Sequence, residues 1–360
     1  TSTILHGKAP YKNCVGTGLG LDENGLKMSK SKGNVLDPWD VINVYGADCT
    51  RWYLYSSSAP WKSKRLAEAD VKDPLYRFLD TLRNTHDFFA LYASIDEYDP
   101  GVHDEQRGDP TVIDRWIRSR TADCVGQVVA ALDAYDVTTA TGAIERLVED
   151  ISNWYVRLSR RRFWKGGMGP DKIAAYATLR SVLLDLSRLS APFVPFISEC
   201  VYRSLRTEDM PESVHLAAYP TPAVSARDEV LDQAMATARA IAALGHQARN
   251  EAQTKVRQPL AALVVESDPL PADVDMLLCG ELNVGAIEWV ASLDDRLDPS
   301  VAPNFRTLGP RVGAHMQGVA EWIKAQPAKD LQQKLAAHGS VDAAVDGVQL
   351  TLEAEDVLLG

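Results

Sequence analysis

Apolar residues recur at helical spacing through the middle of the chain. The clearest run consists of Ile144, Leu147, Val148, Ile151, Trp154, Tyr155 and Leu158. Steps of three and one place these residues on one face of an amphipathic helix. After a glycine-rich break at residues 166–170, a second stripe comprises Leu179, Val182, Leu183, Leu186 and Leu189. Amphipathic helices joined by short links predict an antiparallel helix bundle.

Two proline-containing segments divide this pattern. The first is Ala191-Pro192-Phe193-Val194-Pro195-Phe196, and its prolines predict a break or kink before a further helix through Leu205. The second is Tyr219-Pro220-Thr221-Pro222, which we interpret as the linker between the bundle and the last third of the chain.

The last third of the chain mixes helix and strand signals. A helix is predicted over about 225–252, with strands at 262–265 and 287–290. A hairpin is expected from Val341 to Leu352 around an Asp346-Gly347 turn. The sequence therefore predicts a mainly α chain that ends in a small α+β domain.

The first part of the chain lacks helical periodicity and predicts short strands and loops. Tyr11-Lys12-Asn13-Cys14-Val15 is expected to end a strand, and Asp22-Glu23-Asn24-Gly25 to form a tight turn. Asp37-Pro38 then offers a helix N-cap with proline at the first helical position. That short helix should end at Gly46, and a second helix should open at Asp48.

Three glycines precede the turn. Gly16, Gly18 and Gly20 superficially resemble a dinucleotide-binding loop, but the spacing lacks the third glycine of that motif and the helix that comes after it. We expect instead that backbone crowding in a strand requires glycine here.

Composition places the 360 residues among ordinary globular proteins, with 46% hydrophobic and 24% charged residues. No stretch reaches the 18 or more apolar residues of a membrane span, and the first ten residues lack the hydrophobic core of a signal peptide. We therefore expect no membrane partner and a cytoplasmic location.

The chain lacks an initiator methionine, so we expect it to be part of a longer protein. The five scattered cysteines predict neither disulfides nor a zinc or other metal site.

The net charge of −11 argues against a nucleic-acid partner only at first sight, because phosphate binding depends on local patches. Residues 151–169 contain four arginines and one lysine and no acid, a local charge of +5. Residues 1–35 hold five lysines against Asp22 and Glu23, a local charge of +3. A basic face on an acidic body is therefore compatible with the composition.

The segment from Lys27 to Asn34 is the strongest candidate for chemistry. It packs three lysines, two hydroxyls and a glycine into eight residues, and such a loop can donate several hydrogen bonds to phosphate oxygens. Its spacing is not that of a P-loop. The alternative interpretation is a solvated basic loop without a ligand.

The order Lys27-Met28-Ser29-Lys30-Ser31 resembles the K-M-S-K-S signature of class I aminoacyl-tRNA synthetases, and the Asp-Pro segment from 37 to 48 resembles the segment after that signature in isoleucyl, valyl and leucyl enzymes. Residues 153–164 and 191–196 are more selective, being similar to the anticodon bundle of the isoleucyl family. The segments 255–260, 281–284 and 303–310 are also similar to that family. The resemblance covers essentially the whole chain.

This resemblance implies adenylate chemistry, in which an amino-acid carboxylate attacks the α-phosphate of ATP and pyrophosphate leaves. Lys30 would stabilise the charge on the leaving group, with Lys27 assisting. The residues expected to bind ATP, with its Mg²⁺, are Lys27, Met28, Ser29, Lys30 and Ser31. The family also implies three domains: the end of the catalytic domain with the loop and a stem-contact segment (1–68), a helical anticodon-binding domain (69–220) and an α+β C-terminal domain (221–360).

Transfer RNA that accepts isoleucine is the implied partner, and the chain is expected to be a monomer. The residues expected to contact tRNA are Arg157, Arg160, Arg161, Trp164, Lys255 and Arg257. For Trp154 and Tyr155 core packing is favoured over base stacking, because both lie on the apolar stripe. Lys255 and Arg257 have the alternative of pairing with acids.

The sequence contains no H-I-G-H-type motif, which a class I active site also requires, and neither an amino-acid pocket nor an editing domain. We therefore expect these residues alone to be inactive and the whole enzyme to be an isoleucine–tRNA ligase. Two alternatives remain: a valyl enzyme, and a stand-alone tRNA-binding module without catalysis.

Overall fold

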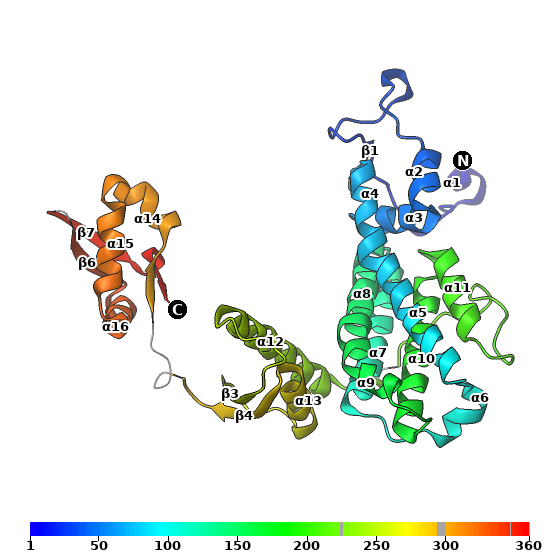
Figure 1. The fold of residues 1–360 in the computed structure, drawn as a ribbon. Coiled ribbons are helices and arrows are strands. Elements are labelled where there is room, and N and C mark those ends of the chain that lie inside the picture. Colours follow the sequence, from blue (N-terminus) through cyan, green and yellow to red (C-terminus); the bar gives the residue numbers. More distant parts are fainter. Residues whose placement is uncertain (224–225, 294–299, 346, 360) are drawn as a thin grey trace. The chain divides into compact units, whose positions relative to one another are not determined.

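Helices dominate the computed structural model, which describes residues 1–223, 226–293, 300–345 and 347–359 and confirms the mainly α expectation (Figure 1). Contacts divide the chain into two units, Thr1–Leu260 with Leu270–Val284, and Ala261–Pro269 with Gly285–Gly360. The expected domain boundaries after residues 68 and 220 stay a prediction.

The predicted bundle forms the body of the first unit. Its long helices are α5 (Asp80–Ile95), α7 (Val112–Asp133), α8 (Val137–Glu149), α10 (Pro170–Ser190) and α11 (Pro195–Leu205). Figure 1 shows α5, α7, α8 and α10 running side by side. The predicted apolar stripes are buried, with Ile144, Ile151 and Leu183 all at 0% exposure. Both expected breaks are confirmed, since α10 begins at Pro170 and α11 at Pro195.

Helix α8 continues into a wider turn rather than ending at Glu149. Residues Asp150–Val156 form a π-helix, and α9 (Arg157–Trp164) follows without a break. Tyr155 in this turn is fully buried, whereas Trp154 is half-buried at its edge. The expectation of core packing is therefore confirmed for Tyr155 and only half met for Trp154.

The segment before the bundle carries two short helices and a small sheet. The expected helices are α2 (Pro38–Tyr45) and α3 (Ala47–Ser56), and the Asp37 carboxylate accepts the backbone N–H of Trp39 at 2.9 Å. Strands β1 (Gly20–Leu21) and β2 (Lys64–Arg65) pair in parallel. The expected turn is confirmed, because the N–H of Asp22 donates to the carbonyl of Leu26 at 2.8 Å. Helices α1 (Ser2–His6) and α4 (Glu68–Pro74) complete this part.

The expected strand at residues 11–15 is wrong. These residues form neither helix nor strand, and the side chains of Tyr11 and Val15 are 63% and 43% exposed. A strand needs a neighbour to pair with, and the short apolar run does not supply one. The sheet forms a few residues later, at Gly20–Leu21.

Gly18 lies against the backbone of a distant loop, as the crowding interpretation predicts. Its N–H donates to the carbonyl of Pro60 at 2.8 Å. A Cβ added at Gly18 would lie 2.1 Å from the carbonyl oxygen of Lys62, whereas one added at Gly16 would meet nothing within 4 Å. A Cβ at Gly20 would meet only the side chains of Leu66 and Met28, at 3.9 Å. Backbone crowding therefore explains Gly18, and the interpretation is wrong for Gly16 and Gly20.

We expect Gly18→Ala to destabilise the chain by at least 1–3 kcal/mol, roughly the cost of overpacking, because the clash is with backbone that cannot rotate away. Gly16→Ala is the matched control and should change the free energy of unfolding by less than about 0.5 kcal/mol. Urea denaturation followed by tryptophan fluorescence measures both. Equal effects of the two substitutions would contradict the crowding interpretation.

Beyond the bundle, α12 (Glu229–Glu251) packs on α13 (Ala272–Leu282), and the expected strands appear as the pair β3 (Leu260–Glu266) and β4 (Val284–Val290). The expected hairpin is also present as β6 (Ser340–Val345) and β7 (Val348–Glu353) in antiparallel register. Its turn residue Asp346 lies outside the described residues.

Three helices that the sequence interpretation did not foresee pack beside that hairpin: α14 (Phe305–Val312), α15 (Met316–Ala325) and α16 (Ala328–His338). They share a core that includes Leu308, Ile323 and Leu335 with strand residues. Strands β5 (Val301–Pro303) and β8 (Val357–Leu359) form a further antiparallel pair. The end of the chain is therefore an α+β arrangement, as expected.

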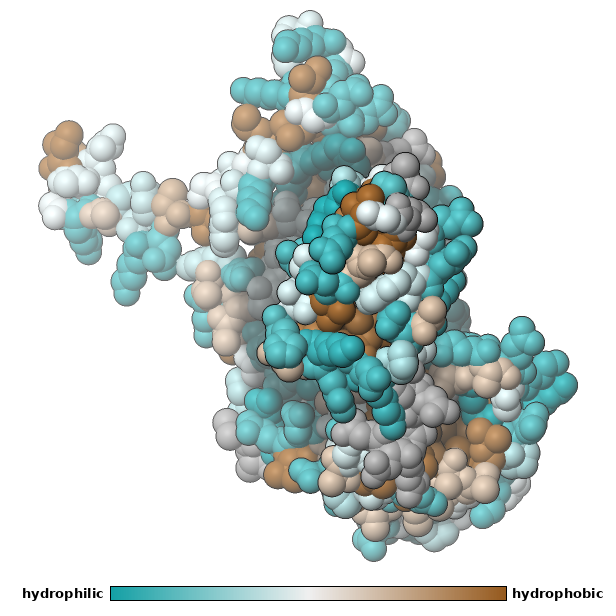
Figure 2. All heavy atoms as spheres, turned by 90° about the vertical axis from the view of Figure 1, so that its left-hand side faces the viewer, coloured by the Kyte–Doolittle hydropathy of each residue, from teal (hydrophilic) through white to brown (hydrophobic). Residues whose placement is uncertain are grey.

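The face drawn in Figure 2 is covered mainly by hydrophilic side chains, with apolar residues in small groups between them. Within the part of the chain that the structure describes, no helix combines the length and the apolar character needed to cross a bilayer.

Candidate nucleotide and nucleic-acid interface

The lysine-rich loop is a short 3₁₀ turn flanked by extended backbone. Lys30–Lys32 form the turn, and Gly33 closes it with a left-handed φ of 68°. Lys27 and Lys30 are exposed, whereas Met28 is half-buried and its N–H donates to the carbonyl of Gly20 at 3.0 Å. The loop therefore begins on the small sheet and presents both ammonium groups to solvent.

Two polar residues outside the expected set hold this loop. The Asn34 side-chain carbonyl accepts the N–H of Ser29 at 2.9 Å, and its amide donates to the Asp22 carboxylate at 2.8 Å. Asp22 also accepts the N–H of Leu26 at 2.8 Å. The bond from Asn34 and these backbone bonds lower the pKa of Asp22. Asn34 ends the Lys27–Asn34 segment, three residues beyond Ser31, and this position was the one sequence signal for its role.

The two hydroxyls of the loop bond to each other. Ser29 Oγ and Ser31 Oγ lie 2.7 Å apart. In this conformation they shape the turn, so the lysines are the groups aimed outward. A charged ligand with several oxygens would meet the exposed lysines of this loop, Lys27, Lys30 and Lys32.

The second candidate surface is the outward face of α9. Arg157, Arg160, Arg161 and Trp164 share this face at helical spacing, and Trp164 is 57% exposed. Among the described residues, no carboxylate forms an ion pair with Arg160 or Arg161. Two exposed guanidinium groups beside an exposed indole suit phosphate contact and base stacking.

Arg162, between those residues in sequence, points inward. Its guanidinium makes two bonds to the Asp114 carboxylate, at 2.9 and 2.8 Å, and the Tyr155 hydroxyl donates to the same group at 2.7 Å. Burial alone would raise the pKa of Asp114, but the arginine and its hydrogen bonds outweigh it, so the pKa is lowered. This buried pair fixes the rotation of α9 and so the direction in which its other arginines point.

Arg157 is partly neutralised where it lies. Its Nη1 is 2.6 Å from Glu281 Oε1, and its guanidinium lies over the ring of Trp154 at 5.2 Å. Nε2 of His246 is 3.0 Å from the same Glu281 oxygen. Arg157 is thus less available to a phosphate than Arg160 or Arg161.

Lys255 and Arg257 lie on an exposed loop after α12. The buried side chain of Arg249 holds this loop in place. Arg249 is 5% exposed, and its guanidinium donates to the carbonyl of Lys255 at 3.2 Å and to that of Leu282 at 2.7 Å. Within the described ranges neither Lys255 nor Arg257 forms an ion pair. Sequence reasoning missed Arg249, since an arginine on a helix gives no sign that it will be buried.

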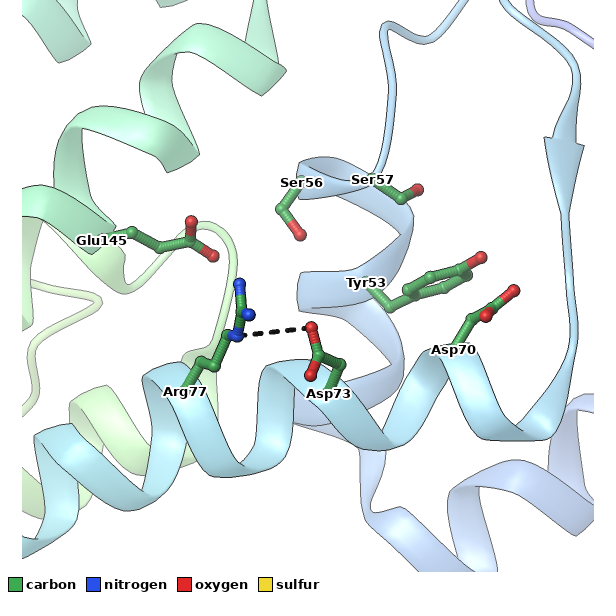
Figure 3. A pocket seen from close by; sticks show the side chains of 7 residues that line it. All are labelled: Tyr53, Ser56, Ser57, Asp70, Asp73, Arg77 and Glu145. Atoms are coloured by element: carbon green, nitrogen blue, oxygen red, sulfur yellow. Dashed lines mark ion pairs between the residues drawn. The ribbon is translucent and has the colours of Figure 1, made fainter. Parts of the chain in front are cut away.

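A polar cavity of about 580 Å³ lies between α3, α4 and α8 (Figure 3). It is lined by Tyr53, Ser56, Ser57, Asp70, Asp73, Arg77 and Glu145. The lining holds three carboxylates and one arginine: Arg77 is paired with Asp73 at 3.5 Å, whereas Asp70 points away from it and pairs with Arg65 at 2.9 Å. Phosphate groups would be repelled, so this cavity does not extend either surface. In the part of the chain that the structure describes, no three His, Cys, Asp or Glu side chains form a group that could hold a metal ion.

Comparison with known proteins gives consistent matches. Residues 114–265 match the family model of the anticodon-binding domain of tRNA ligase, and residues 1–66 match that of class I tRNA synthetases (I, L, M and V). The isoleucine–tRNA ligase of Clostridium acetobutylicum is 39% identical over 99% of this chain and 35% of that protein. Isoleucine–tRNA ligase 2 of Bacillus cereus is 40% identical over 99% of this chain and 34% of that protein. The chain thus spans about a third of the length of these relatives.

Among solved structures, a LeuRS in a ternary complex with tRNA and LeuAMS from Agrobacterium radiobacter K84 superimposes with a TM-score of 0.44 and 22% identity. The match covers 59% of this chain and 24% of that one.

Proposed function

The chain is homologous over 99% of its length to isoleucine–tRNA ligases and joins a class I synthetase segment to an anticodon-binding domain, and from this premise we propose that it supplies the ATP loop and the tRNA-binding surface of such a ligase. The observation that supports this most is the coexistence, in one chain, of the exposed Lys27–Lys30 loop and the exposed arginine face of α9.

In the proposed reaction the isoleucine carboxylate forms a bond to the α-phosphorus of ATP, and the bond to the leaving pyrophosphate breaks. Negative charge grows on that leaving group, and Lys30 stabilises it with help from Lys27. Met28, Ser29 and Ser31 complete the ATP contact, and Asn34 keeps the loop in shape. We propose that the 360 residues alone do not form adenylate.

For the tRNA, Arg160 and Arg161 are proposed to bind backbone phosphates and Trp164 to stack on an unpaired base. Three further residues are proposed as secondary contacts. The charge of Arg157 is partly neutralised by Glu281, and Lys255 and Arg257 lie on a separate loop. A cytoplasmic monomer that uses ATP with Mg²⁺ completes the proposal.

The test is a salt titration of the binding of isoleucine tRNA and valine tRNA to the complete enzyme. A steep fall in affinity with salt, together with a preference for isoleucine tRNA, supports the proposal. Equal affinity for the two tRNAs, or a preference for valine tRNA, would overturn the isoleucine assignment.

We expect the double variant Arg160→Ala/Arg161→Ala to weaken tRNA binding and to reduce the slope of log affinity against log salt by about 2, roughly one for each phosphate that is no longer neutralised. Arg83→Ala/Arg203→Ala is the matched control, because those arginines are also exposed, at 61% and 67% of the side chain. Fluorescence anisotropy with labelled tRNA measures both. An unchanged slope in the α9 variant would remove that face from the proposed interface.

A further inference from the structure

A single buried arginine ties the loop after α12 to the end of α13. Arg249, near the end of α12, donates from Nη1 to the carbonyls of Lys255 at 3.2 Å and Gln258 at 3.1 Å. Its Nη2 donates to the carbonyls of Leu282 at 2.7 Å and Asn283 at 3.1 Å. One guanidinium thus joins both ends of the 255–258 turn to α13, the helix that packs beside α12 (Figure 1).

Two further bonds fix the same turn. The N–H of Gln258 donates to the carbonyl of Lys255 at 2.9 Å, and the Asn283 side-chain amide donates to the carbonyl of Val256 at 2.9 Å. Asn283 has a left-handed φ of 51°, which asparagine adopts more readily than most residues. The carbonyls of residues 255, 256 and 258 are therefore all held by protein donors, which sets the backbone of the turn.

The charge of Arg249 is stabilised in an unusual way. In the part of the chain that the structure describes, no carboxylate forms an ion pair with it, and the four carbonyls solvate a side chain that is 5% exposed. Burial of a cation is unfavourable unless its donors are bonded, and an apolar side chain would fill the space without that penalty. Residues 249–258 hold three cations and one acid, Glu251, so the buried charge adds to the positive potential over the turn.

The side chains that the turn presents are those that a sugar–phosphate backbone requires. Lys255 and Arg257 are exposed, and Val256 between them is 40% exposed. Two cations on either side of an apolar group suit two phosphates and the sugar that joins them. A turn whose conformation is already fixed loses little entropy when it binds.

The end of α13 also contacts the arginine helix. Two residues before Asn283, the Glu281 carboxylate lies 2.6 Å from Nη1 of Arg157 and 3.0 Å from Nε2 of His246 on α12. The segment 281–283 therefore bonds both to α9 and to the 255–258 turn. This arrangement fixes the two cationic surfaces relative to each other, as simultaneous contact with one RNA requires.

We propose that Arg249 is a positioning residue for tRNA binding, which holds the 255–258 turn so that Lys255 and Arg257 contact the backbone of the tRNA bound on α9. Asn283 shares this role through Val256. The inference rests on the proposed function and assigns a task in binding to two residues that do not themselves touch the RNA.

The test is the binding of labelled isoleucine tRNA to the complete enzyme, followed by fluorescence anisotropy over a range of salt concentrations. Lys255→Ala/Arg257→Ala should reduce the slope of log affinity against log salt by about 2, and Arg249→Met should do the same although both cations remain. The triple variant should bind no more than about twofold more weakly than the double variant, because Arg249 then has no contact left to position.

Two further variants separate this role from general damage to the fold. Arg180→Met is the matched control, since Nε of Arg180 also donates to a backbone carbonyl, that of Leu205 at 2.9 Å, but supports the end of α11. It should leave the salt slope unchanged. Asn283→Gly retains a residue suited to the left-handed φ and removes the bond to Val256, so its slope should lie between those of the wild type and Arg249→Met.

Isoleucine-dependent ATP–pyrophosphate exchange without tRNA should stay within about twofold of the wild type in all these variants, because the lysine loop is unaltered. Circular dichroism shows whether each variant folds, and Asn283→Gly decides the question if Arg249→Met does not.

Three results would overturn the inference. The first is a triple variant whose loss of affinity is the product of the losses in Arg249→Met and in the double variant. The second is an unchanged slope in Asn283→Gly and in folded Arg249→Met. The third is an unchanged slope in Lys255→Ala/Arg257→Ala, which would assign the turn to a partner other than tRNA. All three leave the preference of the wild type for isoleucine tRNA intact, whereas loss of that preference would overturn the proposed function itself.

Discussion

Lys30→Ala in the complete enzyme is expected to slow isoleucine-dependent ATP–pyrophosphate exchange about 10²- to 10³-fold, as removal of one transition-state charge contact typically does. The loss should fall on kcat more than on the KM for ATP, because the charge on the leaving pyrophosphate grows only as the reaction proceeds. Lys30 is exposed in the structure, so its removal should leave folding intact.

Lys32→Ala is the matched control for this prediction. Lys32 is also exposed and belongs to the same 3₁₀ turn, but it lies outside the five-residue motif. Its loss should cost less than about tenfold, since a general basic field is screened by salt over about 10 Å. Equal losses for the two lysines would show that the loop acts only through its total charge.

The second large effect concerns stability. Asp114→Ala is expected to destabilise the chain by about 3–5 kcal/mol, because Arg162 and the Tyr155 hydroxyl would lose their buried partner. The carboxylate is fully buried, and the Arg162 side chain is 13% exposed. Chemical denaturation measures the loss, and circular dichroism shows how much helix remains.

Asp171→Ala provides a control on the same arginine. Asp171 lies 2.9 Å from Arg162, but its side chain is 57% exposed. A solvent-exposed pair contributes only about 0–1 kcal/mol, so the two acids should differ by at least about 2 kcal/mol. If they do not differ, the buried pair is not what fixes α9.

Much of the fold could be predicted from periodicity. The stripe through Ile144 and Ile151 was enough to predict a helix and its buried face, and prolines 170 and 195 marked helix starts because each fits the first helical turn. The strand at residues 11–15 failed because a short apolar run does not show whether a partner strand is available. Helices α14 to α16 were not predicted, because the clearest signals in that part of the chain were those of the strands at 287–290 and the hairpin at 341–352 on either side of them.

The candidate sites were predictable only in part. The motif located the lysine loop, but not Asn34 and Asp22, whose role depends on a bond across twelve residues. The run of arginines gave a local positive charge, yet periodicity alone could not show that Arg162 is turned inward, since its partner Asp114 is 48 residues away. Bonds of Arg249 to carbonyls 33 and 34 residues later are beyond any local pattern.

The π-helical turn at Asp150–Val156 limits which deletions this region can tolerate in evolution. Each residue advances an α-helix by about 100°, so deleting one residue within the turn would swing the downstream side chains by that angle. Arg162 would leave Asp114, and Arg160 and Arg161 would rotate off their present face. Backbone bonding would survive such a deletion while the proposed tRNA contacts would not. The number of residues in this turn therefore determines how α9 is rotated about its axis, and so which of its side chains face the core of the bundle and which face solvent.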